Sequence, residues 1–342
     1  MTKLIDSDDV DCNTSHNEHF ETVLAARLSR RSLLRGGFAS AAGVVLGSVG
    51  LAGCGSSDST PAPVSVPPAE KLLAFSAVSK SLADVVSVPV GYSVSVLYAL
   101  GDPLTASTGA YLNDGTDADF ENRSGDHHDG MEFYGLSNAG APAAAGAERG
   151  LLAINHEATT DERLASHFLH ANGGTTTLPR PASEVDKEVA IHGVAVIEVA
   201  KSGAAWSYVK ASAFNRRVTP LTDIELSGPA RGNALLVTKY SATGTKTRGT
   251  LNNCGTGKSP WGSFLTGEEN WSGYFVRGAA DDTARSGDKS IASLKRYGRN
   301  QGATSRHGWE TGGVADKYAR WDISRKGASL DGSDDYRNEM NG

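Results

Sequence analysis

The strongest constraint on the fold is a series of short apolar segments separated by turn-forming residues. Few stretches show a helical repeat, and the 40 glycines are typical of a loop-rich β protein. This pattern predicts an all-β sandwich, barrel or propeller rather than a parallel α/β sheet. No repeat of blade length is visible, so the spacing alone does not choose among the three. The expected strands are 92–100, 131–136, 151–154, 193–200, 206–211, 233–238, 248–252 and 261–266, and the expected helices are 160–171 and 183–190.

Composition and missing motifs exclude several function classes. The formal net charge of −6 argues against a nucleic-acid-binding protein, which would present a basic face. The sequence has no Gly-x-Ser-x-Gly elbow, no His-Glu-x-x-His motif and no phosphate-binding Gly-rich loop with Lys and Ser or Thr. A serine hydrolase, a zincin and a P-loop enzyme are therefore disfavoured.

The N-terminus predicts export. Residues 29–35, SRRSLLR, match the twin-arginine motif through Arg30 and Arg31, and a weakly apolar Gly/Ala-rich run follows. Such signals are recognised by the twin-arginine export machinery and are not anchors. A basic patch before a core helix is the alternative, but the run is too rich in glycine for a good helix interior.

A lipid anchor is a second prediction for this region. Residues 51–54, LAGC, match a bacterial lipobox, so cleavage would leave Cys54 as a lipidated N-terminus; ordinary cleavage to a soluble exported product is the alternative. Residues 55–69 begin with the Ser/Pro-rich stretch GSSDSTPAPVSVPP and read as a tether. We therefore expect a disordered or helical export leader at 1–54, a tether at 55–69 and a β domain at 70–342, located in the periplasm or on the surface.

Export has a consequence for the third cysteine. Processing removes Cys12 and removes or lipidates Cys54, so Cys254 keeps no disulfide partner. A lone thiol in an oxidising compartment is expected to be either buried and inert or coordinated. Cys254 lies in a polar, glycine-rich loop before an apolar run that ends in Glu268 and Glu269.

Carboxylates at strand ends are the candidate metal ligands. Glu157 follows a short strand together with Asn155, and Asp129 lies in a His-His-Asp sequence; for both segments a solvated polar loop is the alternative. Because side chains alternate along a strand, at most one of Glu268 and Glu269 points inward. Calcium and ferric iron accept such hard oxygen donors, and a thiolate would add a ligand suited to iron.

Several of these segments together resemble the PhoX-type bacterial alkaline phosphatases. The most specific part runs from Cys254 to the glutamate pair, and the other matching segments occur in the same order along the chain. They are the twin-arginine leader, 127–131 (HHDGM), 150–157 (GLLAINHE), 228–230 (GPA), 250–254 (TLNNC), 259–266 (SPWGSFLT) and 268–270 (EEN).

The resemblance implies a β-propeller enzyme that hydrolyses phosphate monoesters outside the cytoplasm, for phosphate scavenging. It implies a Ca²⁺ and Fe³⁺ cluster on the propeller axis, with Cys254 as an iron ligand and Glu269 as a metal-ligating glutamate. Glu157 is the next candidate ligand, and Asn155, Glu268 and Asp129 rank lower. Phosphoryl transfer by such a cluster needs no Ser-His-Asp set, because cations stabilise the charge on the phosphate oxygens.

Members of this family are longer than this chain, so we expect an incomplete propeller here. Further carboxylate ligands and the phosphate-binding arginine are expected beyond Gly342, which predicts weak or no activity for the 342 residues alone. Two alternatives remain. One is a surface-anchored, calcium-stabilised β domain that binds a ligand without catalysis, and the other is a propeller phosphodiesterase or lactonase.

Overall fold

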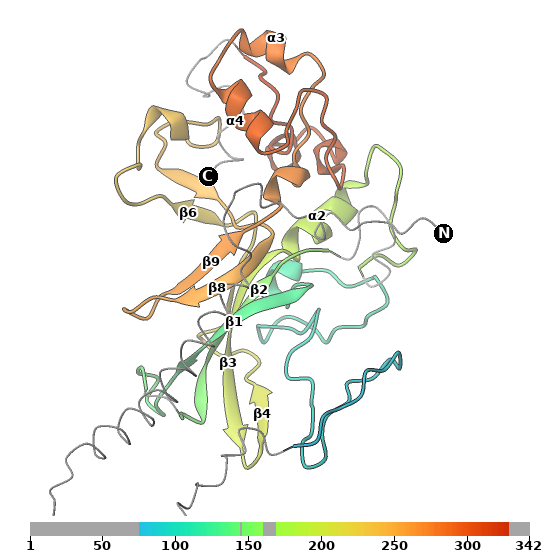
Figure 1. Ribbon diagram of the computed structural model, residues 1–342, viewed down its shortest axis with the longest axis vertical. Helices are drawn as coiled ribbons and strands as arrows, with labels where there is room; N and C mark the ends of the chain where they lie inside the picture. Colours follow the sequence, from blue (N-terminus) through green and yellow to red (C-terminus); the bar gives the residue numbers. More distant parts are fainter. Residues whose placement is uncertain (1–74, 144–145, 160–168, 328–342) are drawn as a thin grey trace, which may run out of the picture. The chain divides into compact units, whose positions relative to one another are not determined.

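The computed structural model describes residues 75–143, 146–159 and 169–327 (Figure 1). The predicted leader, with Arg30, Arg31 and Cys54, and the tether at 55–69 lie outside the described residues, as does most of the helix expected at 160–171. Among the described residues, no helix is both long enough and apolar enough to cross a bilayer.

An antiparallel five-stranded sheet forms the first half of the fold. Its strands are β1 (His128–Gly135), β2 (Arg149–His156), β3 (Gly193–Ser202), β4 (Ala205–Tyr208) and β5 (Arg216–Val218). The order is β1-β2-β3-β4, and β5 pairs with the other end of β3. β3 lies at the centre because its sequence, GVAVIEVAKS, supplies small and β-branched side chains that are buried along most of its length.

Two smaller sheets follow in sequence. β6 (Asp223–Glu225) pairs with β7 (Lys246–Arg248), and β8 (Asn253–Lys258) pairs with β9 (Phe264–Glu268), both antiparallel. The β8–β9 hairpin lies beside β1 and β2 (Figure 1). Gly130 permits this approach, because a Cβ atom there would lie 2.6 Å from the carbonyl oxygen of Cys254.

The helical elements are short and gather in the last third of the described chain. Before them come η2 (Phe120–Asn122), α2 (Ala182–Ala190) and η3 (Ala234–Leu236). The later elements are η4 (Trp271–Tyr274), α3 (Asp281–Arg285), α4 (Ser290–Arg296), η5 (Trp309–Thr311) and α5 (Asp316–Ala319).

Three hydrophobic clusters stabilise these elements. Tyr98, Leu104 and Ile154 pack with Ala195, Ile197 and Val199 against the five-stranded sheet. A larger cluster joins α2 to the C-terminal elements through Val185, Val189, Leu251, Tyr274, Phe275, Leu294, Trp309, Tyr318, Trp321 and Ile323. A third cluster consists of Phe120, Leu169, Ala190 and Ile191.

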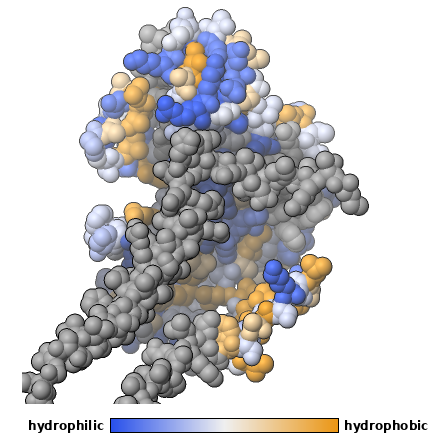
Figure 2. Space-filling model, viewed as in Figure 1, coloured by the Kyte–Doolittle hydropathy of each residue, from blue (hydrophilic) through white to orange (hydrophobic). Residues whose placement is uncertain are grey.

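Most expected strands are confirmed, and four expectations are wrong. Of the strand expected at 248–252, only Arg248 lies in a strand, because β7 (Lys246–Arg248) ends there. Residues 92–100 form no strand, and the side chains of Val94 and Val96 are exposed rather than packed on one face. Exposed hydrophobic side chains of the segment 76–96 appear at the lower right of Figure 2. Residues 233–238 contain the 3-10 helix η3. The Asn233 side chain caps its N-terminus by accepting a hydrogen bond from the Leu235 N–H. Cys254 lies in strand β8 rather than in a loop.

The fold class is confirmed at the level of a mainly β protein with few helices. Over the part of the chain that the structure describes, the sheets close into neither a barrel nor a propeller. The propeller therefore stays a prediction.

Glu188 is the buried polar centre that connects α2 with the C-terminal elements. Its carboxylate accepts hydrogen bonds from Arg180 Nη2 at 2.5 Å, from His170 Nε2 at 3.0 Å and from Trp309 Nε1 at 2.7 Å. Burial alone would raise the pKa of Glu188, but the hydrogen bond from His170 and the charge of Arg180 lower the pKa to about 2.

We expect Glu188→Gln to lower the free energy of unfolding by about 3 kcal/mol at pH 7, because Arg180 would keep a buried, unpaired charge. Because the pKa of Glu188 is lowered in the folded protein, its contribution to the free energy of unfolding also depends on pH. The stabilisation by Glu188 is complete above the unfolded-state pKa, near 4.5, and is lost as the pH falls toward 2. Urea unfolding at pH 7 and pH 3 checks both points. Glu184→Gln is the control, because Glu184 is more exposed and contacts Arg180 at 3.4 Å; equal losses in the two variants would contradict the assignment.

Candidate metal centre

Four predicted site residues converge at one end of the paired sheets. Asp129 is the second residue of β1 and Glu157 directly follows β2, where His128 and His156 are register partners. Cys254 is the second residue of β8, and Glu269 directly follows β9, where Asn253 and Glu268 are partners. Antiparallel pairing in both sheets therefore brings two strand starts and two strand ends together.

The donor atoms of three of these residues lie close together. One carboxylate oxygen each from Asp129 and Glu157 and the Sγ atom of Cys254 all lie within 4.8 Å of one another. Asp129 and Glu269 both lie near enough to the Cys254 thiol to affect its ionisation. This spacing lets one cation contact several of these donors.

The electrostatics of the cluster fit a bound cation. The hydrogen bond to Asp129, burial and the charges of Asp129 and Glu269 raise the pKa of the Cys254 thiol to about 12. Burial, together with the charges of Asp129 and Glu269, also raises the pKa of Glu157. The charges of Asp129 and Glu269 thus disfavour ionisation of Cys254 and Glu157, and a cation would reverse this effect.

Buried amide side chains form hydrogen bonds to the backbone of residues in the cluster. Asn155 is fully buried; its Nδ2 donates to the Cys254 carbonyl at 2.8 Å, and its Oδ1 accepts from Thr266 Oγ1 at 2.9 Å. Asn252 Nδ2 donates to the Glu157 carbonyl at 3.2 Å, whereas Asn252 Oδ1 is buried without a hydrogen-bond partner. An unsatisfied amide oxygen beside the carboxylates is a further hard donor that fits a metal such as calcium.

Backbone geometry around the cluster is unusual. His127, Asn252 and Asn270 all have positive φ, at 45°, 52° and 49°. The Asn252 carbonyl accepts from the Glu269 N–H at 2.9 Å, and the His127 carbonyl accepts from the Glu157 N–H at 3.0 Å. Non-glycine residues in this region carry a conformational cost and are enriched at functional sites.

The glutamate pair separates as strand alternation predicts. Glu268 Oε1 accepts from Thr250 Oγ1 at 2.7 Å and from the Leu251 N–H at 2.8 Å, so it fixes the segment before β8. Glu269 acts on Cys254 and accepts from Asn270 Nδ2 at 2.7 Å. Of the lower-ranked candidates, Asp129 joins the cluster, while Asn155 and Glu268 orient its neighbours.

Sequence reasoning missed Asn252, Asn253 and Thr266. Asn253 is fully buried, and its Nδ2 donates to Thr250 Oγ1 at 2.8 Å and to Thr266 Oγ1 at 2.9 Å. The sequence offers one signal for these residues, the two adjacent asparagines before Cys254. This polar pair stands at the start of a strand and is too short to form a loop by itself.

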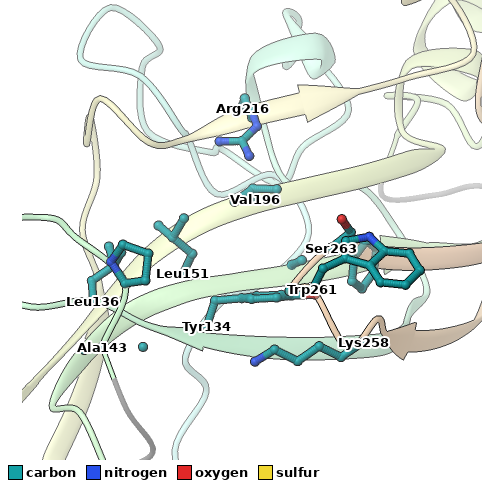
Figure 3. Close-up of a pocket in the computed structure, with 14 residues that line it drawn as sticks. Tyr134, Leu136, Ala143, Leu151, Val196, Arg216, Lys258, Trp261 and Ser263 are labelled. Atoms are coloured by element: carbon teal, nitrogen blue, oxygen red, sulfur yellow. The ribbon is translucent and has the colours of Figure 1, made fainter.

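A further cavity lies away from this cluster. It has a volume of about 550 Å³ and is lined by Tyr134, Leu151, Val196, Arg216, Lys258 and Trp261, among others (Figure 3). Tyr134 belongs to the end of β1, and Lys258 to the end of β8. These are the opposite ends of the strands that carry Asp129 and Cys254, so this cavity is separate from the metal-type cluster.

Comparison with known proteins identifies the family. The family model for alkaline phosphatase PhoX matches residues 73–311, and the chain belongs to this family. A solved structure, Pseudomonas fluorescens PhoX in complex with vanadate, a transition state analogue, is similar with 32% sequence identity and a TM-score of 0.62. The match covers 79% of this chain and 41% of that chain. No curated protein matches.

We expect Asn155→Ala to loosen the β8–β9 hairpin from β2, because both hydrogen bonds of a buried amide disappear. The free energy of unfolding should fall by about 2 kcal/mol, and calcium affinity should fall with it. Urea unfolding and calcium titration measure the two effects. Asn138→Ala is the matched control, since Asn138 is exposed and its carbonyl rather than its side chain accepts from Arg149. Unchanged calcium affinity in Asn155→Ala would contradict the role of the amide.

Proposed function

We propose that this protein is a metal-dependent alkaline phosphatase that hydrolyses phosphate monoesters outside the cytoplasm, for phosphate scavenging. The observation that carries the proposal is the convergence of Asp129, Glu157 and Cys254 within 4.8 Å in a chain of the PhoX family. The chain spans 41% of the Pseudomonas fluorescens PhoX chain, so the activity of the whole enzyme is part of the proposal.

The proposed metals are Ca²⁺ and Fe³⁺. Asp129, Glu157 and Glu269 supply hard carboxylate oxygens suited to calcium, and Cys254 supplies a thiolate suited to iron. When bound, these ions would supply positive charge for the phosphate oxygens and an activated oxygen nucleophile. The four side chains hold the ions, and the buried amides of Asn155 and Asn252 orient Cys254 and Glu157.

Ionisation of Cys254 is the step that the protein itself must control. With its pKa raised to about 12 by Asp129, burial and Glu269, the thiol keeps its proton at neutral pH. Binding of a cation to the thiolate would release this proton to solvent. The carboxylates of Asp129 and Glu269 would then serve as ligands or counter-charges.

We also propose how the protein is exported and where it is anchored. Arg30 and Arg31 would direct export by the twin-arginine machinery, and lipidation of Cys54 would anchor the protein to a membrane by the tether at 55–69. The family match supports a propeller for the complete fold. It does not favour a non-catalytic calcium-stabilised binding domain, a phosphodiesterase or a lactonase.

The test compares neighbouring glutamates in the full chain reconstituted with Ca²⁺ and Fe³⁺. We expect Cys254→Ala to lose iron and keep calcium, and Glu269→Gln to lose about tenfold or more in metal affinity, because a charged ligand is removed. Glu268→Gln is the matched control and should retain both metals, since the amide oxygen still accepts from Thr250 and Leu251. Elemental analysis measures the metals.

Hydrolysis of p-nitrophenyl phosphate and of bis-p-nitrophenyl phosphate gives the second readout. We expect activity on the monoester only, weak for these 342 residues and abolished by Cys254→Ala. Iron content unchanged in Cys254→Ala, or a preference for the diester, would overturn the proposal.

A further inference from the structure

A second cavity, of about 370 Å³, borders the metal-type cluster. It lies between η4 and the segment 299–306, and its lining includes Asn270, Ser272, Arg299, Thr304, Ser305 and Arg306. Among the described residues, the lining contains two arginines and no Asp or Glu, whereas the neighbouring cluster contains carboxylates. Ser305 Oγ already donates to Glu310 Oε2 at 2.7 Å, so the guanidinium groups and the Asn270 amide are the donors that could recognise an oxyanion here.

Gly273 positions the side chain of Arg306. A Cβ atom at residue 273 would lie 2.6 Å from Arg306 Nε and 3.1 Å from its Cζ, so the guanidinium lies directly against the glycine backbone. The Arg306 N–H also donates to the Gly273 carbonyl at 2.9 Å. The missing side chain at residue 273 therefore provides the space that the guanidinium occupies.

Arg299 supplies the second charge. Its Nη1 donates to the carbonyls of Phe275 and Thr304, both at 3.1 Å, while its Nε is buried without a hydrogen-bond partner. Burial and the nearby charge of Arg306 lower the pKa of Arg299. A bound anion near Arg299 would favour the charged form of its guanidinium.

Asn270 connects the cavity to the candidate metal centre. It lines the cavity, and its Nδ2 donates to Glu269 Oε1 at 2.7 Å. Burial raises the pKa of the Tyr274 phenol, and the charges of Arg306 and Glu157 act on this pKa as well. An anion in the cavity would thus lie beside Asn270, the residue that directly follows the proposed metal ligand Glu269.

We propose that this cavity is an oxyanion subsite in which Arg306 and Arg299 bind a phosphate-class dianion beside the metal centre. The dianion has two possible sources: free orthophosphate, which is also the product of the reaction, or a second phosphate on the substrate. The role in substrate choice rests on the proposed function, whereas anion binding by the cavity does not.

The direct test titrates inorganic phosphate into the full chain in the presence of EDTA, by calorimetry. We expect saturable binding that weakens as ionic strength rises. Arg306→Ala should weaken it by about tenfold or more, because a charge-assisted hydrogen bond to the anion is lost. Arg231→Ala is the control, since Arg231 is an exposed arginine paired with Glu225.

The Gly273→Ala variant tests the position of the Arg306 guanidinium without changing the net charge of the protein. The φ angle of Gly273 lies outside the left-handed region, so alanine suits the backbone, but its Cβ would displace the Arg306 guanidinium. We expect a loss of phosphate affinity comparable to that of Arg306→Ala, with the far-UV circular dichroism and melting temperature of the wild type. No saturable phosphate binding, or equal affinity in Arg306→Ala and Arg231→Ala, would overturn the subsite whether or not the protein hydrolyses monoesters.

A kinetic arm distinguishes the two sources of the anion. If the subsite takes a second substrate phosphate, Arg306→Ala raises KM for a sugar bisphosphate and leaves KM for the monophosphate unchanged. If it takes orthophosphate, the same variant weakens product inhibition equally with both substrates. Unchanged KM values and unchanged product inhibition in an active enzyme would contradict a role in the reaction.

Discussion

The buried amide of Asn155 is the interaction on which the arrangement of the site depends. It bridges the large sheet to the β8–β9 hairpin by donating to the Cys254 carbonyl and accepting from Thr266. Together with the hydrogen bond from Asn252 Nδ2 to the Glu157 carbonyl, this bridge joins the two sheets at the end where the donors meet. A buried amide that satisfies two strands at once also fixes their register, since a slip of one residue would leave it unpaired.

The fold tolerates a repulsive cluster because its stability is supplied elsewhere. Asp129 and Glu269 disfavour ionisation of Cys254 and Glu157, and three neighbouring residues have left-handed backbones. These costs are offset by the aromatic and aliphatic core around Trp309 and Trp321 and by the buried ion pair of Glu188 with Arg180. Such a separation is typical of sites whose geometry serves a ligand rather than the folded state.

Local pattern predicted most of the strands and some of the site. Apolar runs located β1, β2 and β3, and strand-end carboxylates marked Glu157 and the pair Glu268 and Glu269, whereas the choice of Glu269 and of Cys254 as ligands came from the family resemblance. The segment 92–100 shows the limit: Tyr92, Val94 and Val96 alternate like a strand, but alternation does not supply the partner strand that would bury them. Cys254 was placed in a loop because Gly255 and Gly257 are poor strand formers, whereas pairing with β9 overrides that propensity. Asn252 and Thr266 act only through long-range contacts, which no local pattern encodes.

Groups of opposite charge lie at adjacent positions where the β8–β9 hairpin is followed by η4. This proximity of the two charges explains why both elements contribute to the region. Phosphate monoesters are dianions near neutral pH, so the carboxylates that hold cations would repel an approaching substrate until those cations are bound. Arg299 and Arg306 line a cavity together with Asn270, whose side chain donates to Glu269, and there they can attract an oxyanion. Asn270 keeps the two charge sets apart because its neutral amide hydrogen-bonds to Glu269 and its left-handed backbone turns the chain into η4. A charged residue at position 270 would either neutralise Glu269 or repel the anion, and either change would remove the separation of charge that a phosphoryl site requires.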